Sequence, residues 1–138
     1  MTVSFRPLDL ADHAACAELW NATEGLGPPP TPAQLGDFLG RNPGFSQVAV
    51  VDDRIFGVLL ASFDGIRGYF YRAAVDRAWR QQGIGASLAT IAAEGLRAAG
   101  AVRINLHVFA SNTAAIAFWR ARGWAIHDGL LCMHRDLA

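Results

Sequence analysis

One segment near the middle of the chain constrains the fold more than any other, because it reads as strand, glycine turn, helix and strand. The strand pattern GYFYRAAV at 68–75 precedes a helical pattern that begins at Gly83 and ends before Gly100, and AVRINLHVF at 101–109 is a second strand pattern. Two strands joined through a helix pair in parallel, with a right-handed connection. The fold must therefore contain a parallel strand pair with a helix across it.

The rest of the chain predicts antiparallel strands and further helices. Alternation of apolar and polar residues predicts strands at 2–8, 46–51 and 55–64, and a closing hairpin at 124–138 over an Asp-Gly turn. Periodicity near 3.6 and capping residues predict helices from Asp9 to Thr23, from Thr31 to Gly40, and from Ser111 or Asn112 to Gly123. On the first of these helices, the expected buried stripe is Leu10, Ala14, Ala17 and Trp20.

These segments define a mixed α/β class for the whole chain. Their order is strand, helix, helix, three strands, helix, strand, helix and two strands. The expected sheet is mostly antiparallel with a central parallel pair, and the absence of repeats or linkers predicts one domain over 1–138.

Charge and composition exclude several functions. The formal net charge is zero, which predicts no nucleic-acid partner and no membrane partner, and all twelve basic residues are arginine. Without lysine, Schiff-base chemistry and the lysine-dependent triphosphate loop are excluded. The two cysteines and four histidines lack metal-ligand spacing, so no metal is expected, and the N-terminus lacks a signal-peptide pattern, which predicts a cytoplasmic protein.

Gly83 and Gly85 stand where the central helix begins, directly after an arginine- and glutamine-rich turn. A helix N-terminus presents unpaired N–H groups and partial positive charge, and glycine lets an anion approach them. The alternative is a tight strand-to-helix turn with no ligand. A dinucleotide fingerprint is excluded because Leu88 replaces its third glycine. The sequence therefore favours another polyphosphate as ligand.

Two motifs together resemble the GNAT superfamily of acyl-CoA-dependent N-acetyltransferases. AVDRAWRQQGIGASL at 74–88 is similar to that family's Arg/Gln-x-x-Gly-x-Gly/Ala motif. SNTAAIAFWRARGW at 111–124 is similar to its second signature, at Asn112, Ala115, Phe118, Trp119, Gly123 and Trp124. The order of the motifs and the predicted elements also fit that fold, and the similarity is nearest to RimI-like and YpeA-like bacterial members.

The resemblance implies an enzyme that transfers an acetyl group from acetyl-CoA directly to a primary amine, either of a small molecule or of a peptide or protein N-terminus. It implies that strands 69–75 and 102–108 separate to admit the pantetheine arm. The implied coenzyme-binding residues are Ala73, Val75, Arg80, Gln81, Gln82, Gly83, Ile84, Gly85, Ala86, Asn112, Ala115 and Trp119.

The resemblance also directs attention to catalytic candidates. Alternation along 102–108 places His107 on the polar face, where RimI-like enzymes carry a catalytic glutamate, so His107 is the candidate base. The alternative is a histidine satisfied by neighbouring groups. The family's usual tyrosine acid is replaced by Trp119, whose indole cannot protonate a thiolate; Tyr69 or Tyr71 could substitute, although strand aromatics also serve as core.

The acceptor pocket is expected to involve Glu24, the proline loop at 27–32 and Asp64, although such acids are also common in loops and turns. Two further interpretations remain open from the sequence: a coenzyme-binding module without catalysis, and an interaction domain whose glycines only form turns. The sequence leaves a homodimer open and does not identify the acceptor amine or the acyl length.

Overall fold

The computed structural model describes residues 2–138. The chain divides into two compact units, one ending at His107 and the other formed by Val108–Ala138.

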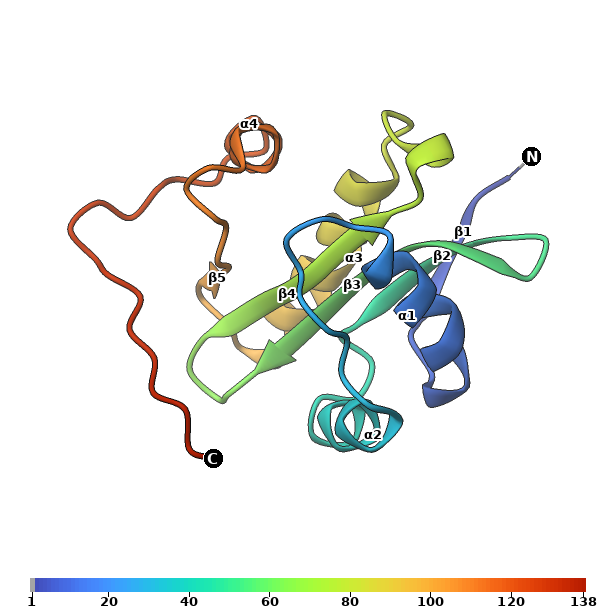
Figure 1. The fold of residues 1–138 in the computed structure, drawn as a ribbon, viewed down its shortest axis with the longest axis horizontal. Helices are drawn as coiled ribbons and strands as arrows, with labels where there is room; N and C mark the ends of the chain where they lie inside the picture. The colour runs from blue at the N-terminus through green and yellow to red at the C-terminus, as the bar shows by residue number, and fades with distance from the viewer. Residues whose placement is uncertain (1) are drawn as a thin grey trace. The chain divides into compact units, whose positions relative to one another are not determined.

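The first unit is built on a five-stranded sheet in which strand order follows chain order (Figure 1). The first four strands pair antiparallel, and the last pair is parallel, as predicted. The strands are β1 (Ser4–Pro7), β2 (Gln47–Val51), β3 (Arg54–Phe63), β4 (Gly68–Val75) and β5 (Ile104–Asn105).

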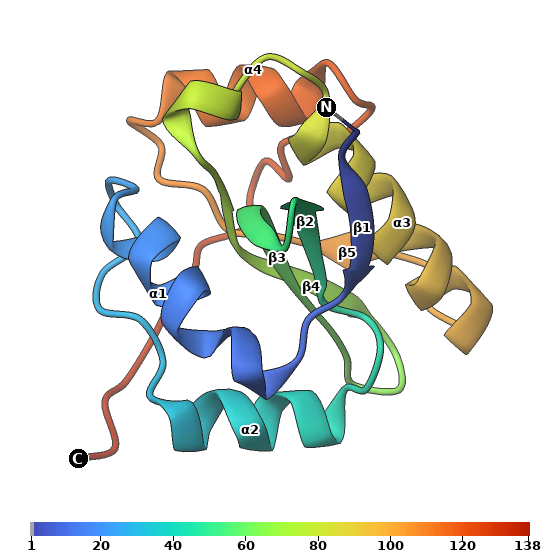
Figure 2. The same ribbon diagram turned by 90° about the vertical axis from the view of Figure 1, so that its right-hand side faces the viewer.

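Helices cover both faces of this sheet, with α1 (His13–Asn21) and α2 (Pro32–Arg41) on one side and α3 (Ile84–Ala99) on the other (Figure 2). Short 3₁₀ helices η1 (Leu10–Asp12) and η2 (Arg77–Trp79) precede α1 and α3. The core beneath α1 and α2 is apolar and includes Cys16, Trp20, Leu35, Val48, Val58 and Leu60.

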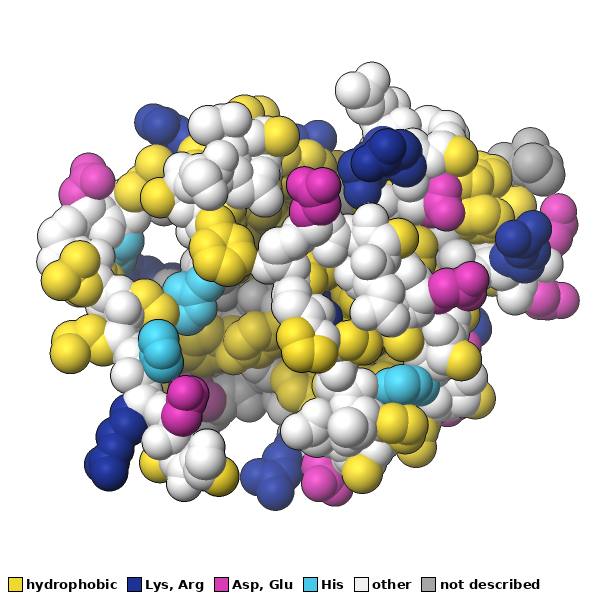
Figure 3. All heavy atoms as spheres, viewed as in Figure 1, with side chains coloured by type: hydrophobic (Ala, Val, Ile, Leu, Met, Phe, Trp, Pro, Cys, Tyr) yellow, Lys and Arg dark blue, Asp and Glu magenta, His cyan; other side chains and the backbone are white. Residues whose placement is uncertain are grey.

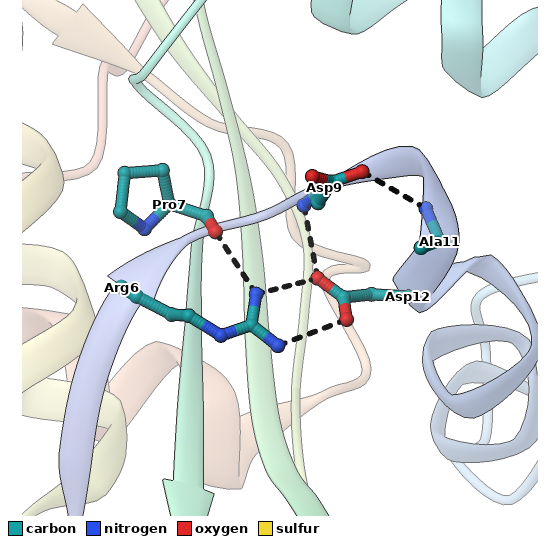
Figure 4. A network of polar contacts seen from close by, with 5 residues as sticks. All are labelled: Arg6, Pro7, Asp9, Ala11 and Asp12. Atoms are coloured by element: carbon teal, nitrogen blue, oxygen red, sulfur yellow. Dashed lines mark hydrogen bonds and ion pairs between the residues drawn. The ribbon is translucent and has the colours of Figure 1, made fainter. Parts of the chain in front are cut away.

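The turn between β1 and α1 is held by a charged network (Figure 4). Asp9 accepts from the Ala11 N–H, and Asp12 accepts from the Asp9 N–H in a capping box. Arg6 contacts both carboxylate oxygens of Asp12 at 2.7 and 2.9 Å. These hydrogen bonds from Arg6 lower the pKa of the Asp12 carboxyl.

Helix α3 packs closely on the sheet because two strand glycines leave space for its apolar side chains. A Cβ on Gly57 would lie 2.9 Å from Ile84 Cγ2, and one on Gly68 would lie 2.9 Å from Leu96 Cδ1. Ile84, Leu88, Ala92 and Leu96 are buried as the periodicity predicts, whereas Ala99 is exposed at the helix end.

The buried stripe predicted for the first helix is wrong, except at Trp20. The residues buried on α1 are Cys16, Leu19 and Trp20, while Leu10 is 44% exposed. The helix starts with a 3₁₀ turn, which has about three residues per turn and shifts the phase of every later residue.

The last two strands of the predicted order are absent. Residues 124–138 contain no strand, and Leu130, Leu131, Met133 and Leu137 are exposed. An isolated hairpin is marginal without a third strand or an apolar surface, and within Val108–Ala138 the only regular element is α4 (Thr113–Arg120). Alternation in the sequence was therefore insufficient to form the hairpin.

Candidate active site

The edge of β4 that faces β5 is only partly paired. β4 pairs with β3 from Gly68 to Val75, but β5 pairs only with Gly68 and Tyr69. From Phe70 onward, no described strand pairs with this edge of β4. The predicted strand at 101–109 is correspondingly wrong in length, because only Ile104 and Asn105 pair with β4.

A β-bulge lies in the uncovered part of β4. Val58 pairs with Ala74 and Leu60 with Tyr71, so β4 carries one extra residue, and Arg72 has φ of 51°. The Trp20 indole N–H donates to the Arg72 carbonyl at 2.8 Å, which holds the bulge against α1. A non-glycine residue in this left-handed region is strained and must be held by its surroundings.

The Arg72 side chain joins the bulge to the loop between α1 and α2. Its Nη1 and Nη2 donate to the carbonyls of Leu26 and Gly27 at 2.8 and 3.1 Å, and the guanidinium lies 5.2 Å from the Trp20 ring. Nε is buried with no hydrogen-bond partner among the described residues. Burial lowers the pKa of Arg72.

His13 holds the other end of the loop between α1 and α2. Its Nε2 lies 2.8 Å from the Pro30 carbonyl oxygen. Because a carbonyl oxygen can only accept a hydrogen bond, Nε2 carries the hydrogen and donates it.

Between this loop, α2 and β4 lies an open hollow of about 810 Å³. Phe38 and Tyr71 both line this hollow and contact each other edge to face, with ring centroids 6.1 Å apart. The lining residues are Pro28, Pro29, Pro30, Gln34, Leu35, Phe38, Leu60, Tyr71 and Arg72.

Beyond β4, the chain forms the glycine turn that the sequence singled out. Asp76 caps η2 through the Ala78 N–H, and Arg80 Nε donates to the Val75 carbonyl at 3.0 Å. Gln81 and Gly83 both have positive φ, at 63° and 79°. Successive N–H groups in alternating conformations of this kind form concave anion sites.

No side chain caps α3 at Gly83, so its first N–H groups lack the partner that a capping residue would supply. A Cβ on Gly83 would meet nothing within 4 Å. Gly83 is therefore required for its left-handed conformation, and the space in front of it is open. Gln81, Gln82, Gly83, Ile84, Gly85 and Ala86 together form this helix entrance.

The tyrosine and aspartate candidates of the first unit, Tyr69, Tyr71 and Asp64, do not belong to this helix entrance. Tyr71 lines the hollow and stacks on Tyr69 at 6.1 Å. Asp64 accepts from the N–H groups of Ile66 and Arg67 at 2.7 Å, and the Arg67 bond leads in lowering the pKa of the Asp64 carboxyl. Its position is that of a turn former.

Glu24 is exposed and does not line the hollow. His107 is exposed and follows the end of β5, so it does not occupy the strand position assigned from alternation.

The second motif lies in the other compact unit. Asn112 caps α4, with its Oδ1 accepting from the Ala115 N–H at 3.1 Å. Trp119 packs edge to face on Phe118 and Trp124, with centroid distances of 4.9 and 5.2 Å. The motif thus starts a helix and builds an aromatic cluster at its end.

Several features of the site had no sequence signal. The motifs point to the glycine turn, but nothing in the sequence marks Arg72 as a bulge residue or pairs Trp20 with it, because these contacts join segments 46 to 52 positions apart. Gln34 could have been noted, since Thr31 and Gln34 form a capping box that is readable from the sequence.

The remaining nucleophile and charge candidates are not organised into a site. Burial raises the pKa of the Cys16 thiol to about 12, so it is protonated at neutral pH. Within residues 2–138, no group of three or more His, Cys, Asp or Glu side chains could hold a metal ion. Arginines and acids are interspersed on the face drawn in Figure 3.

No helix in the described part of the chain combines the length and apolar character needed to cross a membrane.

Comparison with known proteins identifies the class. The acetyltransferase (GNAT) family model matches residues 13–124. Acetyltransferase SG1711 of Sodalis glossinidius is 28% identical over 127 residues, covering 91% of this chain and 89% of that protein. N-alpha-acetyltransferase 30 of Schizosaccharomyces pombe is 30% identical over 98 residues, covering 67% and 65%. The PaiA N-acetyltransferase of Thermoplasma acidophilum, solved with coenzyme A, has a TM-score of 0.81 at 16% identity, covering 93% and 92%.

The chain belongs to the acetyltransferase (GNAT) family. It is an acyltransferase that moves an acetyl group to an amine, with acetyl-CoA as donor. This confirms the class predicted from the two motifs, and the interpretation as a binding module without catalysis is not favoured.

Proposed function

We propose that the N-terminus of α3 binds the diphosphate of acetyl-CoA and that the uncovered edge of β4 binds its pantetheine arm. The observation that carries this proposal is the continuity between the two: the uncovered edge ends at Val75, and the chain then forms the turn with left-handed Gln81 and Gly83. Two phosphate charges suit the N–H groups at Gln81–Ala86, where no side chain caps the helix and the helix dipole is also favourable.

Arg80 acts in this proposal by shaping the turn. Its Nε is bonded to the Val75 carbonyl, which ties the turn to the end of β4. That carbonyl is therefore already engaged, so the arm would use the Val75 N–H and the backbone of Ala73. A backbone N–H between Ala73 and Val75 would donate to the thioester oxygen and stabilise the negative charge that develops there.

The acceptor amine would enter from the hollow beside Tyr71. Tyr71 directly precedes the bulge, so the hollow adjoins the part of β4 assigned to the thioester. The amine nitrogen attacks the thioester carbonyl carbon, the C–S bond breaks, and the sulfur leaves with the electron pair. The ammonium must lose one proton before attack; after attack the nitrogen loses a second proton to give the neutral amide, and the departing thiolate gains a proton.

Tyr71 is the better placed of the two tyrosines to give a proton to the sulfur, because it lines the hollow and directly precedes the bulge, whereas Tyr69 does not line the hollow. His107 remains the candidate base, supported by its place just after β5, where the chain has left the edge of β4. Neither Glu24 nor Asp64 lines the hollow, so no contact of the described residues supports a role for them in binding the acceptor amine. Asp64 instead stabilises the turn before β4 through its hydrogen bonds from the Ile66 and Arg67 N–H groups.

We also propose that 1–138 acts as a single N-acetyltransferase domain. Each compact unit contains one of the two motifs, with Arg80–Gly85 in the first and Asn112–Trp124 in the second. Asn112, Ala115 and Trp119 of the second motif are proposed to contact the coenzyme.

A peptide N-terminus is proposed as one class of acceptor, on the basis of the likeness to RimI-like enzymes.

The test is coenzyme A release from acetyl-CoA with a panel of primary amines and peptides. Tyr71→Phe should lower kcat with little change in the Kd for coenzyme A, and His107→Ala should likewise lower kcat, because each variant removes a group proposed to move a proton. Unchanged kcat in both variants would remove these residues from the mechanism, and no turnover by the parent with any acceptor would refute the proposed function.

A further inference from the structure

The polarity of the residues that line the hollow beside Tyr71 determines which amines can bind there. Most of its wall is apolar: three consecutive prolines, the buried Leu35 and Leu60, and the aromatic rings of Phe38 and Tyr71. Proline has no N–H to donate, so this wall offers few hydrogen bonds to a polar substituent.

The charge that lines the hollow is positive. Arg72 is the charged residue among the described lining residues, and no carboxylate lines the wall. The Arg72 guanidinium donates to two carbonyls, and the ion pairs of the described chain are formed elsewhere, by Arg6 with Asp12 and by Arg97 with Glu94. Its charge is therefore not neutralised by a neighbouring carboxylate.

We propose that this hollow selects primary amines attached to an uncharged apolar group and discriminates against amines that carry a second positive charge. The inference rests on the proposed function, in which the hollow receives the acceptor. An apolar group is removed from water against the proline and aromatic wall. A second ammonium would lose hydration there without a carboxylate to replace it, and it would be repelled by Arg72.

Arg72 is in this view a specificity-determining residue as well as the anchor of the proline loop. It is unsuitable for direct substitution, because its loss would also release Leu26 and Gly27 and remove the contact with Trp20. Gln34 offers a cleaner variant. Its side chain accepts from the Thr31 N–H at 2.9 Å, and a glutamate oxygen can accept the same bond. Gln34→Glu therefore adds one negative charge to the hollow and keeps the cap of α2.

The first experiment compares matched acceptors with the full chain and acetyl-CoA. One pair is n-hexylamine and hexane-1,6-diamine, which differ by one ammonium, and the other is two tetrapeptides that differ only in an N-terminal leucine or lysine. Initial rates of coenzyme A release give kcat/KM for each. We expect the member without the second ammonium to be favoured in each pair by about tenfold per amino group, from repulsion and lost hydration together.

The second experiment repeats these measurements with Gln34→Glu and with a control, Ala33→Glu. Ala33 is exposed on the same helix and does not line the hollow, so the control makes the same change in charge outside it. Gln34→Glu should reduce the preference for the acceptor without a second ammonium by about tenfold, and Ala33→Glu should leave this preference unchanged. Equal melting temperatures for Gln34→Glu and the parent establish that the cap is intact.

The outcomes separate the two levels of the proposal. Preference for the members without a second ammonium, reduced only by Gln34→Glu, supports the inference. Equal or higher kcat/KM for the doubly charged members, or the same response to both glutamates, overturns the inference and leaves acetyl transfer intact. No release with any of the four acceptors overturns the proposed function together with the inference.

Discussion

Gly83 provides the sharpest test of the coenzyme site, through a pair of substitutions that differ only in charge. Gly83 has φ of 79°, and a Cβ there would meet nothing within 4 Å. Asparagine and aspartate tolerate the left-handed conformation better than other side chains, and they are nearly equal in size. Gly83→Asn and Gly83→Asp therefore introduce the same strain and the same volume, and their difference isolates one negative charge.

The expected effect on the free protein is small and similar in both variants. Left-handed strain costs about 1–2 kcal/mol. An unfolding entropy of about 2.1 cal/mol/K per residue gives about 0.3 kcal/mol/K for 138 residues, so each kcal/mol lowers the Tm by about 3 °C. The carboxylate of Gly83→Asp also lies at the N-terminus of α3, where the helix dipole favours it by about 0.3–1 kcal/mol. Without ligand, Gly83→Asp should be at least as stable as Gly83→Asn.

The effect on coenzyme binding should have the opposite sign. Two phosphate charges about 5 Å from the new carboxylate are each repelled by about 0.8 kcal/mol even at a dielectric constant of about 80, which together weakens binding about 15-fold. Coenzyme A at 100 times the parent Kd should stabilise the parent by about 2.7 kcal/mol, or about 9 °C in Tm. At that concentration, Gly83→Asp should gain only about 4 °C.

Thermal unfolding with and without coenzyme A, supported by calorimetric titration, measures both quantities. The reasoning is refuted if Gly83→Asn and Gly83→Asp bind coenzyme A with equal Kd, because the diphosphate then does not lie at the entrance of α3. A parent whose Tm does not respond to coenzyme A would refute the site altogether.

Three further predictions concern the scaffold. Gly57→Ala should destabilise the fold by about 1–3 kcal/mol in urea unfolding, because its Cβ would lie 2.9 Å from Ile84 Cγ2; an unchanged midpoint would mean that α3 moves away without cost. Asp12→Asn should cost about 1 kcal/mol at neutral pH, since Arg6 is partly exposed. The folded-state pKa of Asp12 is lowered, so its contribution is present above the unfolded pKa of about 3.9 and is lost as pH falls through the folded value; the stabilities of parent and Asp12→Asn should therefore converge below about pH 4, and a constant gap down to pH 2 would contradict this. Thr31→Ala should lower the free energy of unfolding by about 1 kcal/mol through loss of the α2 cap, and circular dichroism and urea unfolding measure it.

Local signals predicted most of the first compact unit. The helix from Ile84 to Ala99 begins after Gly83 and ends at Gly100, which has φ of 112°, as glycine at these positions favours. Proline at the first position of α2 and the turn between β2 and β3 were equally readable. Such features depend on residues a few positions apart, so the sequence contains all the information needed to predict them.

The sequence predicted less well where formation of an element depends on a distant partner. A long strand was expected at 101–109, but only Ile104 and Asn105 pair with β4. A hairpin was expected from the alternating residues of 124–138, but this segment contains no strand. Alternation of apolar and polar residues indicates that a segment is compatible with a β-sheet. Pairing also requires a neighbouring strand with free N–H and C=O groups.

By itself, the sequence determined the class of this protein and the location of its glycine turn, because both depend on motifs whose residues are close along the chain. Only the tertiary structure decided the acceptor side: the bulge at Arg72, its bonds to Leu26 and Gly27, and the apolar hollow above β4. These features exist because strands and loops separated by more than forty residues pack together, and the strained backbone of Arg72 is held only by those distant contacts.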